Sequence, residues 1–92
     1  MSAESFDFVL SSQIRLTILS FLSHNSCTPT QLSKTFQKHL SHVSRALKEL
    51  ENKDLVACSN PIDAKPRVYQ LTNDGVRLLA EIYRYQARMK MA

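Results

Sequence analysis

Hydrogen-bonding and cationic side chains are concentrated in two short segments of this sequence. The first segment carries hydroxyl, imidazole, guanidinium and ammonium groups, on Ser41, His42, Ser44, Arg45 and Lys48. The second carries two cations on either side of Pro66, namely Lys65 and Arg67. Groups of these types donate hydrogen bonds to phosphate oxygens and to the edges of bases, so both segments are suited to binding a polyanion.

Catalytic and metal-binding arrangements are not recognisable in the sequence. A chain with one glycine has no glycine-rich loop that could cradle a phosphate group. Glu49 and Glu51 are two residues apart on a predicted helix, so their carboxylates point in different directions. The three histidines lack the spacing of a metal-ligand cluster. We therefore expect neither enzyme activity nor a metal ion or other cofactor.

The length and composition are those of an ordinary globular protein with one domain, since the chain has 92 residues, of which 43% are hydrophobic and 22% charged. The net charge of +4 permits binding to a phosphate backbone without demonstrating it. No apolar run is long enough to span a membrane, and the N-terminal residues lack the pattern of a signal peptide. The expected location is cytoplasmic, with no membrane partner.

The two cysteines, Cys27 and Cys58, are far apart and belong to no Cys-x-x-Cys motif. Each lies in or beside a predicted helix or strand. The sequence favours two reduced, partly buried thiols, and a redox switch is the alternative.

Three helices are predicted in the first half of the chain. Apolar residues at helical spacing predict one over residues 12–22, with Ser11 or Ser12 as its N-cap. A short one follows, with Thr28 at the N-cap, Pro29 at the first helical position and an end near residue 36 or 37. The third begins between residues 39 and 41 and ends near Lys53. Its apolar side consists of Val43, Ala46, Leu47 and Leu50, and its opposite side is polar.

The second half predicts a β-hairpin and a long helix. Two strand-like segments, residues 55–59 and 67–71, are joined by a turn that contains two prolines. Thr72 caps a helix that runs to about residue 89, and Gly75 weakens its first turn slightly. This helix has two apolar stripes. The first stripe consists of Val76, Leu79 and Tyr83, and the second of Leu78, Ile82, Tyr85 and Met89.

A helix with two apolar stripes requires two packing partners. We expect its own core to cover one stripe and a second copy of the chain to cover the other. The N-terminal segment around Phe6 and Phe8 is too apolar for a free tail, so we expect a short helix or arm that packs on the domain or on a partner subunit. The predicted dimer interface therefore consists of Leu78, Ile82, Tyr85, Met89, Phe6 and Phe8.

The order of these elements is helix–turn–helix followed by a hairpin, which is typical of DNA-binding proteins. In this interpretation residues 41–53 form a recognition helix for the major groove, and the wing at residues 60–67 contacts the backbone or the minor groove. The expected DNA-binding residues are the seven polar and basic ones of the two segments described first. The alternative interpretation is a protein-interaction or architectural module without sequence-specific DNA binding.

Three segments, residues 12–19, 41–56 and 69–79, resemble the winged-helix transcriptional regulators of the ArsR-type and MarR-type groups. The resemblance implies a mainly α fold with a small β-hairpin, within one domain over residues 1–92. Residues 11–72 would form the helix-turn-helix and wing, and residues 73–90 a dimerisation helix. It also implies a homodimer that binds a near-palindromic operator in double-stranded DNA, with an effector that stays unknown. Two departures are the absence of the Cys-x-Cys of ArsR-type metal sensors and Asp54 in place of a glycine.

Overall fold

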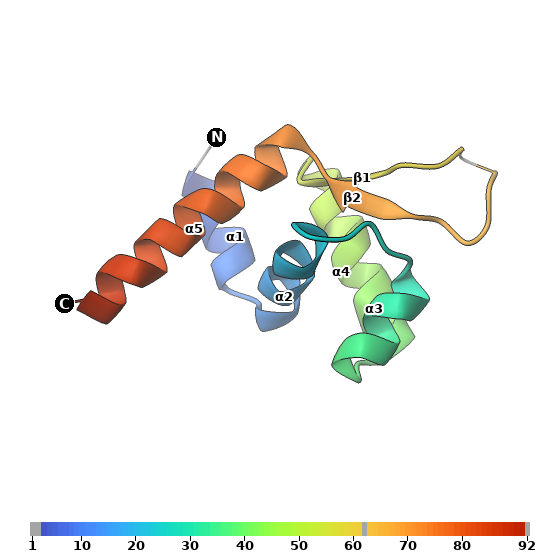
Figure 1. Cartoon of the computed structure of the whole chain (residues 1–92), viewed down its shortest axis with the longest axis horizontal. Coiled ribbons are helices and arrows are strands. Elements are labelled where there is room, and N and C mark those ends of the chain that lie inside the picture. The colour runs from blue at the N-terminus through green and yellow to red at the C-terminus, as the bar shows by residue number, and fades with distance from the viewer. Residues whose placement is uncertain (1–2, 62, 92) are drawn as a thin grey trace.

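Five helices and a two-stranded sheet make up the fold in a computed structural model, which describes residues 3–61 and 63–91 (Figure 1). The elements in chain order are α1 (Ala3–Leu10), α2 (Gln13–Leu22), α3 (Pro29–Phe36), α4 (Leu40–Asn52), β1 (Val56–Cys58), β2 (Tyr69–Leu71) and α5 (Asn73–Met91). The prediction of a mainly α fold with a small hairpin and a long last helix is confirmed. The N-terminal segment is a true helix, one of the two possibilities that its sequence left open.

The helix starts have the predicted caps. The hydroxyl of Ser12 accepts a hydrogen bond from the backbone N–H of Arg15 at 3.4 Å and so caps α2. Thr28 and Gln31 form a reciprocal capping box at the start of α3, with Pro29 at the first helical position. These caps satisfy backbone donors that the first helical turn leaves without a partner. They explain why short segments start as helices at these residues.

The hairpin pairs β1 with β2 in antiparallel register, with Val56 opposite Leu71 and Cys58 opposite Tyr69. A third segment, which the sequence pattern did not reveal, pairs with the other edge of β2. The N–H of Cys27 donates to the carbonyl of Tyr69 at 3.1 Å, and the N–H of Tyr69 donates to the carbonyl of Cys27 at 2.8 Å. This bridge ties the start of α3 to the base of the hairpin.

The core is shared by all five helices and the hairpin. Its fully buried members include Ile18 and Leu19 of α2, Leu32 of α3, and Leu47 and the neighbouring apolar side of α4. Phe21 and Phe36 meet edge to face at its rim, with ring centroids 5.3 Å apart. The core therefore fixes both helices of the helix–turn–helix motif against α2.

The prediction that Leu78 and Ile82 face a partner subunit is wrong, because both side chains are 0% exposed within the single chain. The reason is that α1 packs against α5 and supplies the second packing partner from the same chain (Figure 1). Phe6 packs edge to face on Tyr85, with ring centroids 5.4 Å apart, and Phe8 contacts Arg15 of α2. The large apolar residues that stay exposed on α5 are Val76, Tyr83, Tyr85 and Met89. Of these, Tyr85 and Met89 belong to the predicted interface.

The end of α4 is a left-handed turn centred on Asp54, whose φ is 60°. The N–H of Asp54 donates to the carbonyl of Glu51 at 2.9 Å, and the N–H of Leu55 donates to that of Leu50 at 3.0 Å. This is the Schellman pattern, in which glycine is favoured at the left-handed residue. Asp54 occupies the glycine position with the glycine conformation, so the departure noted in the sequence leaves the turn intact.

Gly75 has a packing role that its sequence position does not reveal. It is buried in the first turn of α5, and a Cβ placed on it would collide with the carbonyl oxygen of Leu55. A side chain of Leu71 lies 3.4 Å from the same point. The absence of a side chain lets α5 approach the backbone that leads into β1, and this compensates for the lower helix propensity of glycine.

We expect Gly75→Ala to destabilise the protein by about 1–3 kcal/mol, because the added methyl group must displace backbone. In an unobstructed helix the same change would stabilise by about 1 kcal/mol, so the sign of the effect is the test. Chemical denaturation measures the free energy of unfolding. Ala80→Gly on the exposed side of α5 is the control and should cost about 1 kcal/mol. A Gly75→Ala variant more stable than the wild type would contradict the close approach.

Candidate nucleic-acid interface

The turn between α3 and α4 is tight and held by local hydrogen bonds. Gln37 adopts the left-handed conformation, with a φ of 54°, and its N–H donates to the carbonyl of Ser33. The N–H of Lys38 also donates to this carbonyl, at 3.1 Å, while the hydroxyl of Ser33 donates to the carbonyl of Lys38. The turn thereby sets α4 at a fixed angle to α3, as a helix-turn-helix requires.

Helix α4 separates its two sides sharply. Its apolar stripe is buried, with Val43 and Leu47 1% exposed and Leu50 0%. The structure brings all five predicted residues of this helix to the exposed surface, namely Ser41, His42, Ser44, Arg45 and Lys48. Because the buried stripe fixes the rotation of the helix about its axis, these polar groups point outward.

Three further residues extend this surface at the start of α4. Lys38 lines a shallow hollow of about 280 Å³ together with His42 and Arg45, so these three donors lie around one depression. The rings of His39 and His42 meet edge to face, with centroids 5.5 Å apart. Leu40 is 48% exposed, and an apolar side chain at this place can contact a thymine methyl group.

The sequence pattern does not single out these additional residues. Lys38 and His39 lie in the turn, where no periodic pattern marks them. Leu40 fits neither the apolar nor the polar side of the helix. A rule that includes the turn before a recognition helix would have found them.

The wing is organised by Asn60. Its side-chain oxygen accepts hydrogen bonds from the N–H of Val68 at 3.0 Å and from the thiol of Cys58 at 2.9 Å. Its side-chain nitrogen donates to the carbonyl of Pro66 at 2.9 Å. One amide thus joins both sides of the loop, and the exposed cation Lys65 lies within that loop.

Arg67 lies at the base of the wing. Its guanidinium donates a hydrogen bond to the side chain of Tyr69. Desolvation lowers the pKa of Arg67, but the nearby Cys58, Tyr69 and Glu51 together raise this pKa by more, so that it ends above its ordinary value. The guanidinium therefore stays protonated. The two wing residues differ, because Lys65 is exposed in the loop while Arg67 is anchored to its neighbour on β2.

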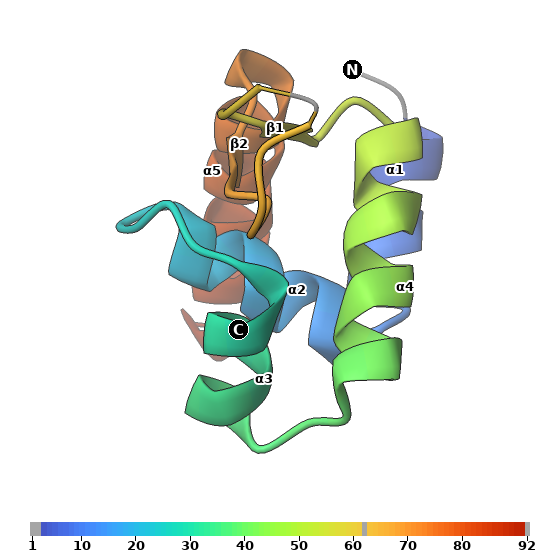
Figure 2. The same ribbon diagram turned by 90° about the vertical axis from the view of Figure 1, so that its right-hand side faces the viewer.

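The hairpin, α3 and the start of α4 lie at one end of the elongated molecule, whose extents are 46 × 27 × 21 Å (Figure 1). Viewed from this end, the hairpin and both helices of the motif face the viewer (Figure 2). The C-terminal end of α5 lies at the opposite end. One surface can therefore contact an extended ligand with the helix and the wing together.

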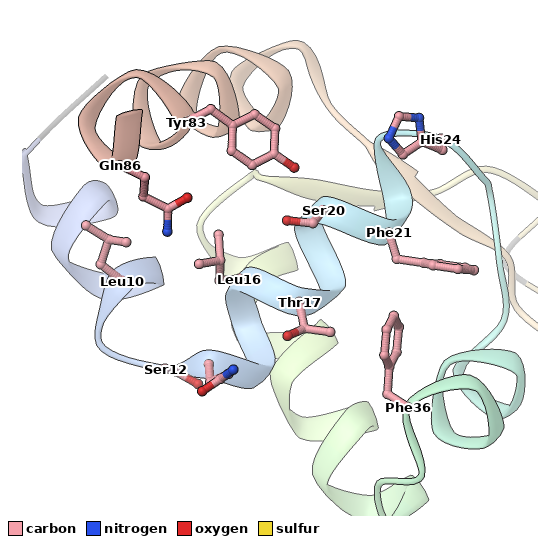
Figure 3. Close-up of a pocket in the computed structure, with 11 residues that line it drawn as sticks. Leu10, Ser12, Leu16, Thr17, Ser20, Phe21, His24, Phe36, Tyr83 and Gln86 are labelled. Atoms are coloured by element: carbon pink, nitrogen blue, oxygen red, sulfur yellow. The ribbon is translucent and has the colours of Figure 1, made fainter. Parts of the chain in front are cut away.

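A separate cleft of about 830 Å³ lies between α2, α5 and the end of α3 (Figure 3). Apolar and aromatic groups line it, including Leu16, Phe21, Phe36 and Tyr83, with polar groups such as Gln86 among them. None of the predicted DNA-binding residues lines this cleft. Among the described residues, no group of three or more His, Cys, Asp or Glu side chains could hold a metal ion. No helix in the described parts of the chain is long and apolar enough to cross a membrane.

The fold and the exposed helix define the class of protein as a winged helix-turn-helix. Residues 12–57 match the family model described as "Bacterial regulatory protein, arsR family". This match spans half of the chain, from α2 into β1, and includes the whole helix–turn–helix motif. The chain therefore belongs to the ArsR family of bacterial regulatory proteins. No curated protein has a sequence that matches it significantly.

Solved structures of bacterial regulators share the fold. The adhesin competence repressor AdcR from Streptococcus pyogenes is 23% identical with a TM-score of 0.69, over 85% of this chain and 59% of that chain. A mutant of ZitR from Lactococcus lactis is 20% identical with a TM-score of 0.72, over 84% and 53%. A mutant of MepR from S. aureus bound to an oligodeoxyribonucleotide is 21% identical with a TM-score of 0.76, over 97% and 70%. This chain spans between half and three fifths of the AdcR and ZitR chains.

The two cysteines lie on either side of β2, since both pair with Tyr69 of that strand. Two strand spacings separate their Cα atoms by about 9.5 Å, whereas a disulfide needs less than about 7 Å. A disulfide within the chain is therefore excluded without a change of the backbone. Cys27 is 3% exposed, and burial raises the pKa of its thiol above the ordinary value, which disfavours the reactive thiolate.

We expect iodoacetamide to modify Cys58 first and Cys27 only slowly in the folded protein. The reason is that Cys27 is buried and that its raised pKa keeps the thiol protonated, so its modification rate should rise only at a higher pH. Mass spectrometry over time measures modification at each residue. A Cys58→Ser variant isolates the slow site, and urea should remove the difference. Equal rates for both thiols in the folded wild type would contradict this assignment.

Proposed function

We propose that this protein is a transcriptional regulator that binds double-stranded DNA sequence-specifically as a homodimer. The recognition helix, residues 41–53, enters the major groove, and the wing, residues 60–67, contacts the backbone or the minor groove. The observation that carries the proposal is the polar, exposed side of α4, opposite a fully buried stripe and next to the basic wing. Membership of a family of bacterial regulatory proteins supports it.

Different residues of this surface are suited to different contacts. Arg45 lies on the exposed side of α4, and a guanidinium can donate two hydrogen bonds to a guanine edge. Three short or planar donors can approach bases, namely Ser41, His42 and Ser44. The longer side chain of Lys48 can reach phosphates. Lys65 and Arg67 contact phosphates from the wing, which positions the helix without reading the sequence.

A second copy of the chain is the proposed partner for the exposed apolar side chains of α5. Among the residues whose exposure the structure describes, four of the five exposed large hydrophobic ones lie on this helix, at Val76, Tyr83, Tyr85 and Met89. They form two pairs on opposite sides of the helix, Val76 with Tyr83 and Tyr85 with Met89, and each pair is a candidate for burial in an interface. Tyr85 and Met89 thus remain in the proposed contact, Phe6 extends it beside Tyr85, and Val76 and Tyr83 are added. Leu78, Ile82 and Phe8 act inside the subunit.

The dimer gives the DNA-binding surface its geometry. A two-fold axis at α5 would present two recognition helices to successive major grooves, about 34 Å apart. The operator would accordingly be near-palindromic. We further propose that the protein acts in the cytoplasm, where bacterial DNA lies, and that it has no catalytic activity.

We expect Arg45→Ala to weaken binding to the selected operator by roughly 1–3 kcal/mol and to relax base preference at one position of each half-site. Lys65→Ala should instead weaken binding to all sequences alike and reduce the salt dependence of the affinity, because it removes a phosphate contact. Titrations of operator and random duplexes at several salt concentrations measure both effects. Selection from a random DNA pool supplies the operator.

Arg88→Ala in the last turn of α5 is the control, since it removes the same charge at the end of the molecule opposite the proposed DNA-binding surface. Its effect on operator affinity should be within about twofold at physiological salt, where distant charges are screened. If the wild type prefers no sequence, or if Arg45→Ala binds as the wild type does, DNA recognition through α4 is wrong. A protein-interaction role would then be the remaining interpretation.

We expect the wild type to sediment as a dimer at tens of micromolar and the double variant Tyr85→Glu with Met89→Glu to sediment as a folded monomer. The charges would face the partner's apolar surface, and both positions are exposed in the single chain. A second variant, Val76→Glu with Tyr83→Glu, tests the other flank of α5. Ile82→Glu is unsuitable because it places a charge in the subunit core. A monomeric wild type, or dimers in both variants, would show that the contact lies elsewhere.

A further inference from the structure

Arg15 of α2 binds to two other helices at once. Its guanidinium lies 3.8 Å above the centre of the Phe8 ring in α1, and one of its nitrogens, Nη1, donates to the carbonyl of Phe8 at 2.9 Å. The other, Nη2, donates to Oε1 of Glu49 in the recognition helix at 3.1 Å. One side chain therefore joins α1, α2 and α4.

The environment of this ion pair differs from that of a surface pair. The Arg15 side chain is 18% exposed and that of Glu49 is 39% exposed, whereas the pair Arg77–Asp74 is 72% and 59% exposed at 3.7 Å. The planar guanidinium stacks on the ring and forks to two acceptors at the same time, which a lysine could not do. The ring and the carbonyl of Phe8 thus orient the Arg15 guanidinium toward the Glu49 carboxylate.

The position of Glu49 gives this ion pair a consequence for the DNA-binding surface. Glu49 follows Arg45 by four residues, so the two side chains are neighbours on one side of α4, about 6 Å apart along its axis. Both line the same hollow, together with His42 and Lys38. Arg15 and Arg45 are both cations that a carboxylate in this place can pair with. In the described structure it pairs with Arg15, and no ion pair joins it to Arg45.

We propose that Arg15 is a positioning residue for DNA recognition, because it holds the Glu49 carboxylate away from Arg45 and so leaves the Arg45 guanidinium available to a base. Without Arg15, the carboxylate turns to Arg45 and repels the phosphates of an approaching duplex. The role of Phe8 is to keep Arg15 in the productive position. This inference rests on the proposed function, in which Arg45 contacts DNA.

The test compares the operator affinity of Arg15→Gln with that of the combined variant Arg15→Gln with Glu49→Gln. Arg15→Gln should reduce operator affinity about fivefold relative to Arg88→Gln, which removes the same charge at the far end of α5, a range expected for a partly exposed ion pair. Glu49→Gln in the same chain should restore the affinity to within about twofold, because the competing carboxylate is gone. A merely structural role for the Arg15–Glu49 pair predicts no such restoration, since both partners are then lost. Phe8→Leu should act in the direction of Arg15→Gln, with a smaller effect.

A second measurement needs no DNA. In arginine labelled with ¹⁵N, the Nε–H resonance of Arg45 should shift in Arg15→Gln and return when Glu49→Gln is added. Circular dichroism confirms that each variant is folded at the temperature used. A combined variant as weak as Arg15→Gln, or an Arg45 resonance that does not move, overturns the proposal. A wild type without sequence preference, or an Arg45→Ala variant with full affinity, would instead overturn the proposed function. The Arg45 resonance would still test whether the Glu49 carboxylate pairs with Arg45 when Arg15 is replaced.

Discussion

The buried apolar stripe of α4 is the interaction on which the candidate interface depends. Val43, Ala46, Leu47 and Leu50 are at most 2% exposed, and each large side chain contributes about 1.5–3 kcal/mol when it is removed from water. Polar contacts of similar number on the opposite side would contribute far less, because water competes for them. Hydrophobic packing therefore sets the orientation of the recognition helix. The polar groups on its exposed side are not needed for this packing and are available to a ligand.

Hydrophobic burial also explains why the interface predicted for α5 was partly wrong. The two apolar stripes of this helix imply two partners, and a short chain suggests that one must be another subunit. The chain supplies both, since α1 packs against α5 and Phe6 contacts Tyr85. Leu78 and Ile82 consequently belong to the subunit core, and the surface left for a partner consists of residues at the margins of the stripes.

The features that the sequence predicted depend on neighbouring residues. Thr28, Pro29 and Gln31 form a cap within four positions, and the hairpin follows from two strand-like segments around a proline-rich turn. The features it did not predict join distant parts of the chain. The pairing of Cys27 with Tyr69 leaves no periodic pattern, and Arg15 and Glu49 are 34 residues apart. Charged residues are common on amphipathic helices, so the sequence does not indicate which of them form an ion pair. The three-dimensional packing of the helices identifies the partner.

Net charge illustrates why position matters more than composition for this surface. The excess of +4 is spread over the chain, and four cations lie on α5, at Arg77, Arg84, Arg88 and Lys90. The C-terminal end of that helix and the wing lie at opposite ends of a molecule with a longest extent of 46 Å, whereas the screening length at physiological salt is about 8 Å. The field that a duplex would meet is set instead by a few groups around α4 and the wing. Glu49 is the anion nearest to Arg45 along α4, and its pairing with Arg15 balances the negative charge beside the proposed DNA contact.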